Sequence, residues 1–418
     1  MDRAKCVTEG SRWGGIVVKQ IDILIAHPQK HHVYHLAAGC QESGLNTRLL
    51  VPLYRKGLGA CMAALPGGIG AKARGYYYDG LDEKLVFSPM NWQVRRMLTS
   101  AANLSDFQSR FDSYVAKLLT LRRLRPRVFV TMQDYMPEAV SAAKAAGAII
   151  WSDQILNRSA EARARMEIQS ATGPVEAQKP HSDACNDVVL SAADLVTVPS
   201  RYTADGLVGR TPETATIHYV PYGVDETLFS RKCSKQSDVV RVIARANDVR
   251  KGGHLLLPAL ARYGSRLLEL TEGKCIQVVI LGTIDDVVRK MLSTENLPTG
   301  LSVIPMTVPH IEVPGLLASA DIFVMPSLSE GMSLISIEAM KMGLPIVITP
   351  FCGIDCFKHM EMGVEVTDTI KSLGEGLLAA FHHRFEWPAW GRSAKLAASN
   401  LGWNAYENKI ANIARGLV

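Results

Sequence analysis

Short apolar runs alternate with amphipathic segments along most of the chain. The runs have the length of β-strands, and the segments between them repeat apolar residues at helical spacing. Strands that alternate with helices in this way form parallel sheets covered by helices on both faces. The sequence therefore predicts an α/β fold.

The alternation runs through the chain twice, which predicts two domains. In the first half we expect strands at 21–26, 48–51, 128–131, 148–151 and 195–199, with helices at 33–44, 137–146 and 184–193. In the second half we expect strands at 239–244, 277–281, 301–304, 322–326 and 345–349, with helices at 253–263, 287–292, 313–318 and 333–342. The polar stretch 230–237 is typical of a linker. The expected architecture is two doubly wound domains across a cleft, with ligands at the carboxyl ends of the strands.

Composition places the chain among globular proteins. Its 418 residues are 47% hydrophobic and 21% charged, which is too long for one ordinary core and too apolar for a disordered chain. No apolar run approaches the roughly 18 residues that span a bilayer, and residues 1–20 lack a signal-peptide core. We therefore expect a cytoplasmic protein. The eight cysteines are scattered, and Cys352 and Cys356 have no second pair of zinc ligands nearby.

The net charge of +6 is concentrated around residues 90–130, where eight basic residues accompany two acidic ones. Phe107, Phe111, Tyr114 and Leu118 recur there at helical spacing, so one helix has an apolar face and a basic face. Two interpretations stay open. The helix packs on a sheet with its basic face in solvent, or the basic face rests on anionic lipid head groups. Nucleic-acid binding is not expected, because no known reader motif accompanies the charge.

The segment 326–345, PSLSEGMSLISIEAMKMGLP, carries the most chemical information. A predicted strand ends at proline, a loop follows with Glu330 and Gly331, and a helix begins near Ser333. Glycine lets a ligand approach the backbone closely. A helix N-terminus offers free N–H groups and a dipole that favours an anion. We therefore predict a diphosphate site at the N–H groups of Met332, Ser333 and Leu334.

Two carboxylates flank this predicted site. Glu330 precedes it, and Glu338 lies about 7 Å further along the helix. Carboxylates accept hydrogen bonds from hydroxyl groups, so one can hold a sugar and the other a ribose. Arg245 and Lys251 follow the first strand of the same domain, where their charges would neutralise a departing diphosphate. The neighbouring Arg250 is expected to be an ordinary surface residue.

These residues resemble glycosyltransferase family 4, a large retaining family with the GT-B fold. The resemblance covers residues 195 to about 349 and rests on four motifs. In chain order they are the loop VPYGVDETLF at 220–229, Arg245 with the Lys251–Gly252 pair, the strand ADIFVMPS at 320–327, and two glutamates, Glu330 and Glu338, with seven residues between them.

The resemblance implies a retaining transferase that moves a sugar from a UDP- or GDP-linked donor to a hydroxyl of a glycan or lipid-linked acceptor, in polysaccharide or glycoconjugate biosynthesis. It assigns Glu330 to sugar hydroxyls, Glu338 to ribose, and the amides of residues 331–334 with Arg245 and Lys251 to the diphosphate. No metal and no further cofactor are expected, and the chain contains no Asp-x-Asp sequence. The implied domains are 1–230 on the acceptor side, 237–395 for the nucleotide-sugar, and a helix within 396–418 that returns to the first domain.

The N-terminal half departs from the family pattern. The sequence HPQKHH at 27–32 replaces a glycine pair, and Ser152 stands where many members have a histidine that contacts the donor sugar. Asp153 is a candidate for a sugar-facing role instead. Four histidines could line the acceptor side of the cleft, although packing or solvent explains each of them more simply: His27, His31, His32 and His35.

Three other functions make different demands on the sequence. The string GIGAKA at 68–73 matches a dinucleotide fingerprint, but no predicted strand precedes it and no predicted helix follows it, so we expect a loop and no dehydrogenase. A nucleotide-sugar epimerase of the same architecture, which needs acid and base residues in the cleft, stays open. So does a catalytically silent subunit that binds nucleotide-sugar.

Overall fold

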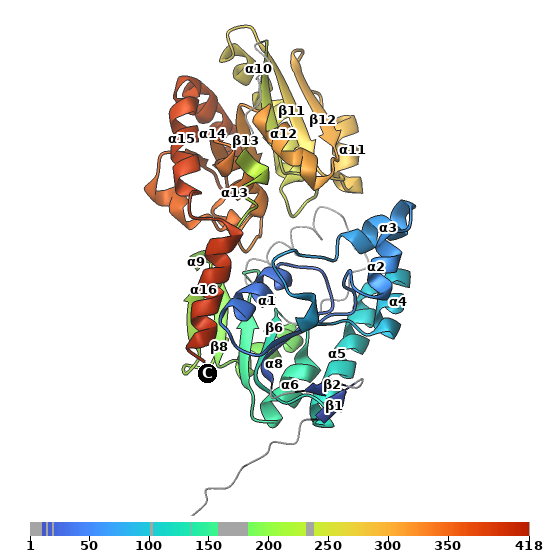
Figure 1. Ribbon diagram of the computed structural model, residues 1–418. Helices are drawn as coiled ribbons and strands as arrows, with labels where there is room; N and C mark the ends of the chain where they lie inside the picture. The colour runs from blue at the N-terminus through green and yellow to red at the C-terminus, as the bar shows by residue number, and fades with distance from the viewer. Residues whose placement is uncertain are drawn as a thin grey trace, which may run out of the picture.

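The computed structural model describes residues 11–13, 16–18, 21–100, 103–133, 135–157, 183–230 and 238–417. The molecule has two lobes, each with one parallel β-sheet between helices, and the chain returns to the first lobe at its end (Figure 1). The predicted α/β class with two doubly wound domains is confirmed. The predicted linker lies outside the described residues, apart from Ser230.

The N-terminal sheet has seven parallel strands in the spatial order β5-β4-β3-β6-β7-β8-β9. In chain order they are β3 (Ile21–Ala26), β4 (Thr47–Leu50), β5 (Val86–Phe87), β6 (Pro126–Met132), β7 (Ile149–Asp153), β8 (Leu195–Val198) and β9 (Thr216–Tyr219). A separate antiparallel hairpin consists of β1 (Ser11–Trp13) and β2 (Ile16–Val18). The central strands are almost fully buried because helices cover both faces of the sheet.

The helices of this domain correspond to the predicted periodic segments, with some additions. They are α1 (Val33–Glu42), α2 (Leu58–Ala63), α3 (Gly67–Arg74), α4 (Met90–Leu98), α5 (Leu104–Thr120), α6 (Pro137–Ala145), α8 (Asp183–Ala192) and α9 (Arg201–Asp205). The predicted helix with one apolar face is confirmed as α5, since Phe107, Phe111 and Leu118 are buried. Tyr114 is partly buried and packs on Trp92 of α4.

The prediction of a loop at 68–73 is wrong, because these residues lie in α3. Pro66 is the N-cap with extended backbone, and its fixed φ is compatible with a helix start. The good helix formers that follow it, Ala71 to Arg74, outweigh the glycines before them. A dinucleotide site needs a strand that leads directly into the helix, and here the helix α2 precedes α3. The sequence GIGAKA is therefore still not expected to bind a dinucleotide.

The C-terminal sheet has six parallel strands in the order β12-β11-β10-β13-β14-β15. They are β10 (Val239–Ala244), β11 (Cys275–Leu281), β12 (Leu301–Met306), β13 (Ile322–Met325), β14 (Ile346–Ile348) and β15 (Gly363–Glu365). The chain runs outward from β10 to β12 and then crosses to β13, so the strand order reverses between β10 and β13. The carboxyl ends of these two strands flank the crevice where such folds bind ligands.

The helices of the second half include several that the periodicity analysis did not assign. They are α10 (Gly253–Glu269), α11 (Asp286–Thr294), α12 (Val313–Ala318), α13 (Leu334–Lys341), α14 (Ile370–His382), α15 (Trp387–Ala397) and α16 (Trp403–Arg415). Short 3-10 helices are η1 (Glu83–Leu85), η2 (Leu228–Ser230), η3 (His310–Glu312), η4 (Pro350–Cys352), η5 (Asp355–His359) and η6 (Arg384–Glu386). Of the helices described, none is long and apolar enough to cross a membrane.

Helix α16 lies against α1 in the N-terminal lobe, although it follows the C-terminal domain in sequence (Figure 1). Its Trp403 ring stacks on the His35 ring at 3.8 Å, and Nδ1 of His35 lies 2.7 Å from Oε1 of Glu407. The hydroxyl of Tyr78 donates to the same oxygen. These contacts attach the end of the chain to its first helix.

Candidate active site between the two domains

A cavity of about 890 Å³ lies between the two domains at the carboxyl ends of both sheets. Its N-terminal wall consists of His31, His32, Tyr135, Ile155, Leu156 and Tyr222. Its C-terminal wall includes the charged side chains Arg245, Arg250, Lys251, His310, Glu330 and Glu338, and the segment from Ser329 to Ile335. Every predicted site residue except Asp153 therefore lines the cavity.

The loop that carries Glu330 begins where β13 ends and finishes at the N-terminus of α13. Ser333 is the N-cap of α13, because its Oγ accepts a hydrogen bond from the N–H of Ser336 at 3.3 Å. The N–H of Ser333 itself donates to the carbonyl of Cys352 at 2.9 Å. The prediction that this N–H is free for phosphate is therefore wrong: the neighbouring 3-10 helix η4 supplies its partner, which sequence spacing did not reveal.

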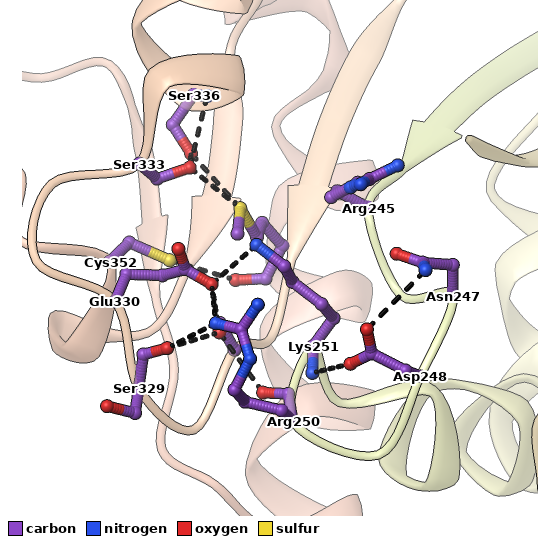
Figure 2. A network of polar contacts seen from close by, with 12 residues as sticks. Arg245, Asn247, Asp248, Arg250, Lys251, Ser329, Glu330, Ser333, Ser336 and Cys352 are labelled. Carbon is purple, nitrogen blue, oxygen red and sulfur yellow. Dashed lines mark hydrogen bonds and ion pairs between the residues drawn. The ribbon is translucent and has the colours of Figure 1, made fainter. Parts of the chain in front are cut away.

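Glu330 is the centre of a compact ionic network (Figure 2). Its Oε1 accepts hydrogen bonds from Nη1 of Arg250 and Nζ of Lys251, both at 2.6 Å, and from Oγ of Ser327 at 3.0 Å. The side chains of Glu330 and Lys251 are only 13% and 12% exposed. Burial by itself raises the pKa of Glu330, but the charges of Lys251 and Arg250 outweigh burial, so the net effect lowers this pKa.

Arg250 was expected at the ordinary surface, and the structure places it in the site instead. It donates to Glu330 and also to the carbonyl of Ser329 at 2.8 Å. The loop reaches this position because Gly252 has a φ of +79°, and a Cβ there would lie 2.1 Å from the carbonyl oxygen of Pro326. The close approach brings the end of β10 against the end of β13.

Arg245 enters the cavity from the other side of the same loop and lies apart from the Glu330 network (Figure 2). Its Nη1 donates to the carbonyl of Leu281 at 2.6 Å. Burial lowers the pKa of its guanidinium. Three cationic side chains thus face the cavity from one loop, against the two carboxylates Glu330 and Glu338.

Glu338 lies in α13 and pairs with a residue that the sequence analysis missed. Nε2 of His310 is 2.9 Å from Oε1 of Glu338, and this hydrogen bond raises the pKa of His310. His310 begins η3, in the segment after β12. A polar residue at the carboxyl end of a predicted strand was an available signal for it.

Gly331 lines the cavity and also lies at the contact between the two domains. A Cβ at this position would lie 1.9 Å from the carbonyl oxygen of Ile155, in the N-terminal domain. The carbonyl of Gly331 accepts hydrogen bonds from Oγ of Ser200 at 2.6 Å and Oγ1 of Thr203 at 3.1 Å. The absent side chain therefore allows the two domains to touch beside the cavity.

The N-terminal wall presents histidine and tyrosine side chains. Of the four candidate histidines, His31 and His32 line the cavity. Burial lowers the pKa of His31 to about 4, which makes this side chain neutral at physiological pH. His27 is fully buried and burial lowers its pKa well below the ordinary value, whereas His35 binds α16.

Asp153 was predicted to face a sugar, but the structure places it behind the cavity wall. Its side chain is 4% exposed, and its Oδ2 lies 2.7 Å from Nε2 of His32. Its Oδ1 accepts a hydrogen bond from Oγ1 of Thr197. Asp153 thus contacts His32, which lines the cavity, and does not line it itself. In the described ranges no group of three or more His, Cys, Asp or Glu side chains could hold a metal ion.

Sequence comparison finds similarity in the C-terminal domain. Residues 237–383 match the family model described as Glycosyl transferases group 1. MMP alpha-(1->4)-mannosyltransferase from Mycolicibacterium hassiacum is 33% identical over 163 residues, which are 38% of this chain and 38% of that protein. D-inositol 3-phosphate glycosyltransferase from Pseudarthrobacter chlorophenolicus is 27% identical over 169 residues, 37% of each chain. The match therefore spans less than two fifths of the length of these relatives.

Structure comparison covers almost the whole chain. Sucrose-phosphate synthase from Thermosynechococcus elongatus superposes with a TM-score of 0.62 at 14% identity, over 95% of this chain and 99% of that one. WaaG, a glycosyltransferase involved in lipopolysaccharide biosynthesis, superposes with a TM-score of 0.62 at 15% identity, over 94% and 100%. Anabaena HepE, solved in complex with UDP and glucose, gives 0.59 at 14%, over 94% and 99%.

Two parallel-sheet domains around a polar cleft, in the arrangement of these structures, define the GT-B fold. Residues 237–383 carry the similarity of this chain to the glycosyl transferases group 1 family.

Proposed function

We propose that the protein is a retaining glycosyltransferase that moves a sugar from a nucleotide-diphosphate donor to an acceptor hydroxyl. The observation that carries the proposal is the position of Glu330, Arg250 and Lys251. These charged groups meet at the N-terminal end of α13, beside the carboxyl ends of β10 and β13, and they face the cavity between the domains. A diphosphate seated there would meet cations and a helix dipole of the right sign.

In the proposed reaction the bond between the sugar C1 and the diphosphate oxygen breaks, and a bond from C1 to the acceptor oxygen forms on the same face. The acceptor proton goes to the departing phosphate oxygen. The charge that builds up on the diphosphate is balanced by Arg245, Arg250 and Lys251, so the proposed chemistry needs no metal ion. Glu330 holds Arg250 and Lys251 in place before the donor binds, and its second oxygen is the one proposed to accept from sugar hydroxyls. Glu338 is proposed to bind the ribose.

Relatives and neighbours support the substrate class. The named relatives transfer mannose or act on D-inositol 3-phosphate, and the HepE structures contain UDP-glucose or UDP with glucose. We propose a UDP- or GDP-linked sugar as donor and a glycan or lipid-linked acceptor in polysaccharide or glycoconjugate biosynthesis.

The test is incubation of the purified protein with UDP-glucose, UDP-galactose, UDP-N-acetylglucosamine and GDP-mannose, followed by analysis of nucleotides and sugars. Slow hydrolysis or transfer with release of UDP or GDP, the anomeric configuration being retained, is the expected result. An isomerised sugar on an intact donor would indicate an epimerase. Binding without turnover of any donor would indicate a silent subunit.

We further propose that the protein works at the cytoplasmic face of a membrane and contacts anionic lipid through α3 and α4. On α4, the exposed side chains Met90, Val94 and Leu98 are spaced four residues apart and therefore form one stripe. On the neighbouring α3, Ile69 is 54% exposed. Neither helix contains an acidic residue, and Arg95 is exposed beside the stripe. Apolar side chains flanked by cations suit the interface of an anionic bilayer.

Co-sedimentation with vesicles tests this contact. Wild-type protein should bind vesicles that contain phosphatidylglycerol and not vesicles of phosphatidylcholine alone. The double variant Arg95→Glu, Leu98→Ser should stay in solution, while Arg392→Glu, which alters an exposed arginine on α15, should bind like wild type. Unchanged binding of the double variant would refute the lipid contact without affecting the proposed reaction.

A further inference from the structure

A chain of buried hydrogen bonds ends at the cavity on His32. Nε1 of Trp151 donates to Oγ1 of Thr197 at 3.0 Å. Thr197 donates from the same oxygen to Oδ1 of Asp153 at 2.5 Å, and Oδ2 of Asp153 lies 2.7 Å from Nε2 of His32. Trp151 and Thr197 are fully buried and Asp153 is 3% exposed, so water does not compete with these bonds.

The chain has only one possible direction. An indole N–H is a donor only, so the oxygen of Thr197 accepts from Trp151 and uses its own proton toward Asp153. An ionised carboxylate is an acceptor only. Nε2 of His32 must therefore carry a proton and donate the hydrogen bond to Asp153. Neutral His32 is therefore the Nε2–H tautomer, and its Nδ1 has a lone pair and no proton.

The side chain of His32 is 6% exposed and lines the cavity, and Nδ1 is the ring nitrogen that Asp153 does not contact. In the part of the chain that the structure describes, no group forms a hydrogen bond with this nitrogen, and the residue lines the cavity. The ring of Tyr222 lies 4.5 Å from the His32 ring at an angle of 49°, and the Tyr406 ring meets it edge-on at 5.8 Å. Two neighbouring rings and the bond to Asp153 thus hold the imidazole in one orientation.

We propose that Nδ1 of His32 accepts a hydrogen bond from a hydroxyl group of a sugar in the cavity, and that Asp153 and Thr197 are positioning residues that fix its tautomer. A lone pair attracts a hydroxyl proton and repels the oxygens of a diphosphate. The sugar is therefore held between His32 on the N-terminal wall and Glu330 on the C-terminal wall. This inference rests on the proposed function, because it assumes that a sugar substrate occupies the cavity.

Two substitutions of His32 separate its two nitrogens. The amide of Gln extends to the place of Nε2, so His32→Gln keeps a partner for Asp153 and removes the acceptor at Nδ1. The amide oxygen of Asn overlaps the position of Nδ1, so His32→Asn keeps the acceptor there and loses the hydrogen bond to Asp153. We expect kcat to fall about tenfold or more in His32→Gln, and His32→Asn to recover part of that loss. Equal kcat in His32→Gln and wild type would overturn the proposal.

Binding measurements with UDP-glucose, GDP-mannose, UDP and GDP identify which sugar provides the hydroxyl. If it belongs to the donor, His32→Gln weakens binding of the nucleotide-sugar about tenfold and leaves the bare nucleotide unchanged. If it belongs to the acceptor, donor binding is unchanged and the KM for the acceptor rises. Equal weakening of nucleotide and nucleotide-sugar would overturn the proposal, because the contact would then be to the nucleotide and not to the transferred sugar or the acceptor.

The tautomer provides a readout that does not depend on activity. In wild-type protein labelled with ¹⁵N-histidine, the His32 signals are assigned as those that are absent from the spectrum of His32→Gln. These signals should show a protonated Nε2 and an unprotonated Nδ1. In Asp153→Asn, Thr197 still donates to the amide oxygen, so the amide NH₂ faces Nε2 and the proton should move to Nδ1. A wild-type His32 protonated at Nδ1 would overturn the inference, whether or not any donor is turned over.

Discussion

The two walls of the cavity differ in charge and in the way the sequence encodes them. The C-terminal wall draws most of its charges from two short stretches, 245–251 and 330–338, each next to a strand end. The N-terminal wall is assembled from four separate segments, and no lysine or arginine is among its described lining residues. In the proposed function one domain provides charge for a diphosphate, and the other provides histidine and tyrosine side chains without lysine or arginine.

This difference indicates a division of labour between the domains. Phosphate binding needs cations and N–H groups at one point, which a single βα loop can supply. Recognition of a neutral hydroxyl needs one oriented lone pair, which takes several elements to fix. The contact of Gly331 with Ile155 joins the two walls, and substitutions on either side of it can separate their contributions.

The largest expected effect is that of Glu330→Ala. The substitution removes the acceptor shared by Arg250, Lys251 and Ser327, and with it the proposed sugar contact. We expect kcat to fall by about 100-fold with little change in the fold, as measured by steady-state release of UDP or GDP and by circular dichroism. Glu312→Ala, which removes an exposed carboxylate of η3, serves as the control and should retain wild-type turnover. Wild-type turnover of Glu330→Ala would refute its assigned role.

Lys251→Ala should weaken nucleotide binding by about tenfold or more, because a charged hydrogen bond to phosphate is lost. Isothermal titration with UDP and with the matching nucleotide-sugar should show the same loss for both ligands. Lys290→Ala changes an exposed lysine on α11 and should leave both affinities unaltered. A loss confined to the nucleotide-sugar would show that Lys251 contacts the sugar rather than the phosphates.

Gly331→Ala should disturb the junction between the walls. A Cβ 1.9 Å from the carbonyl of Ile155 requires one domain to shift, at a cost of about 1–3 kcal/mol. Urea unfolding should show this loss of stability, and turnover should fall with it. Gly315→Ala, on α12, places its methyl group in open space and should be neutral or slightly stabilising. Unchanged stability of Gly331→Ala would mean that the domains do not close as observed.

The smallest expected effect is the pH dependence of the bond between His310 and Glu338. The pKa of His310 is raised in the folded protein, so the contribution of this bond is complete below the unfolded value of about 6.5. It is lost as the pH rises through the folded pKa. Exposure of His310 keeps the contribution below about 1 kcal/mol.

Thermal unfolding between about pH 5 and 8 checks this sign. The difference in Tm between wild type and His310→Ala should be largest at the acidic end and should shrink as the pH rises. His359→Ala, at an exposed histidine of η5, provides the comparison for a nonspecific effect. A difference that grows with pH would contradict the assigned cause.

Local sequence predicted the elements of the C-terminal wall well. The end of β13, the Glu330 loop and the start of α13 follow from a proline, a glycine and an apolar period within one segment. Arg245 and Lys251 line the cavity as expected, because the carboxyl ends of β10 and β13 are adjacent in a parallel sheet. The availability of the Ser333 N–H was not predictable, because its partner is the carbonyl of Cys352, 19 residues further along the chain.

The sequence by itself determined the α/β class, the two-domain division and the residues at the ends of the C-terminal strands, because hydrophobic period and turn residues act over a few neighbouring positions. Only the tertiary structure decided that His32 reaches Asp153, 121 residues away, and that Gly331 meets Ile155. Both contacts join strand ends or domains that are distant in sequence. The packing of the sheets and of the two domains determines which residues meet in these contacts. A pattern within a few neighbouring residues cannot predict them.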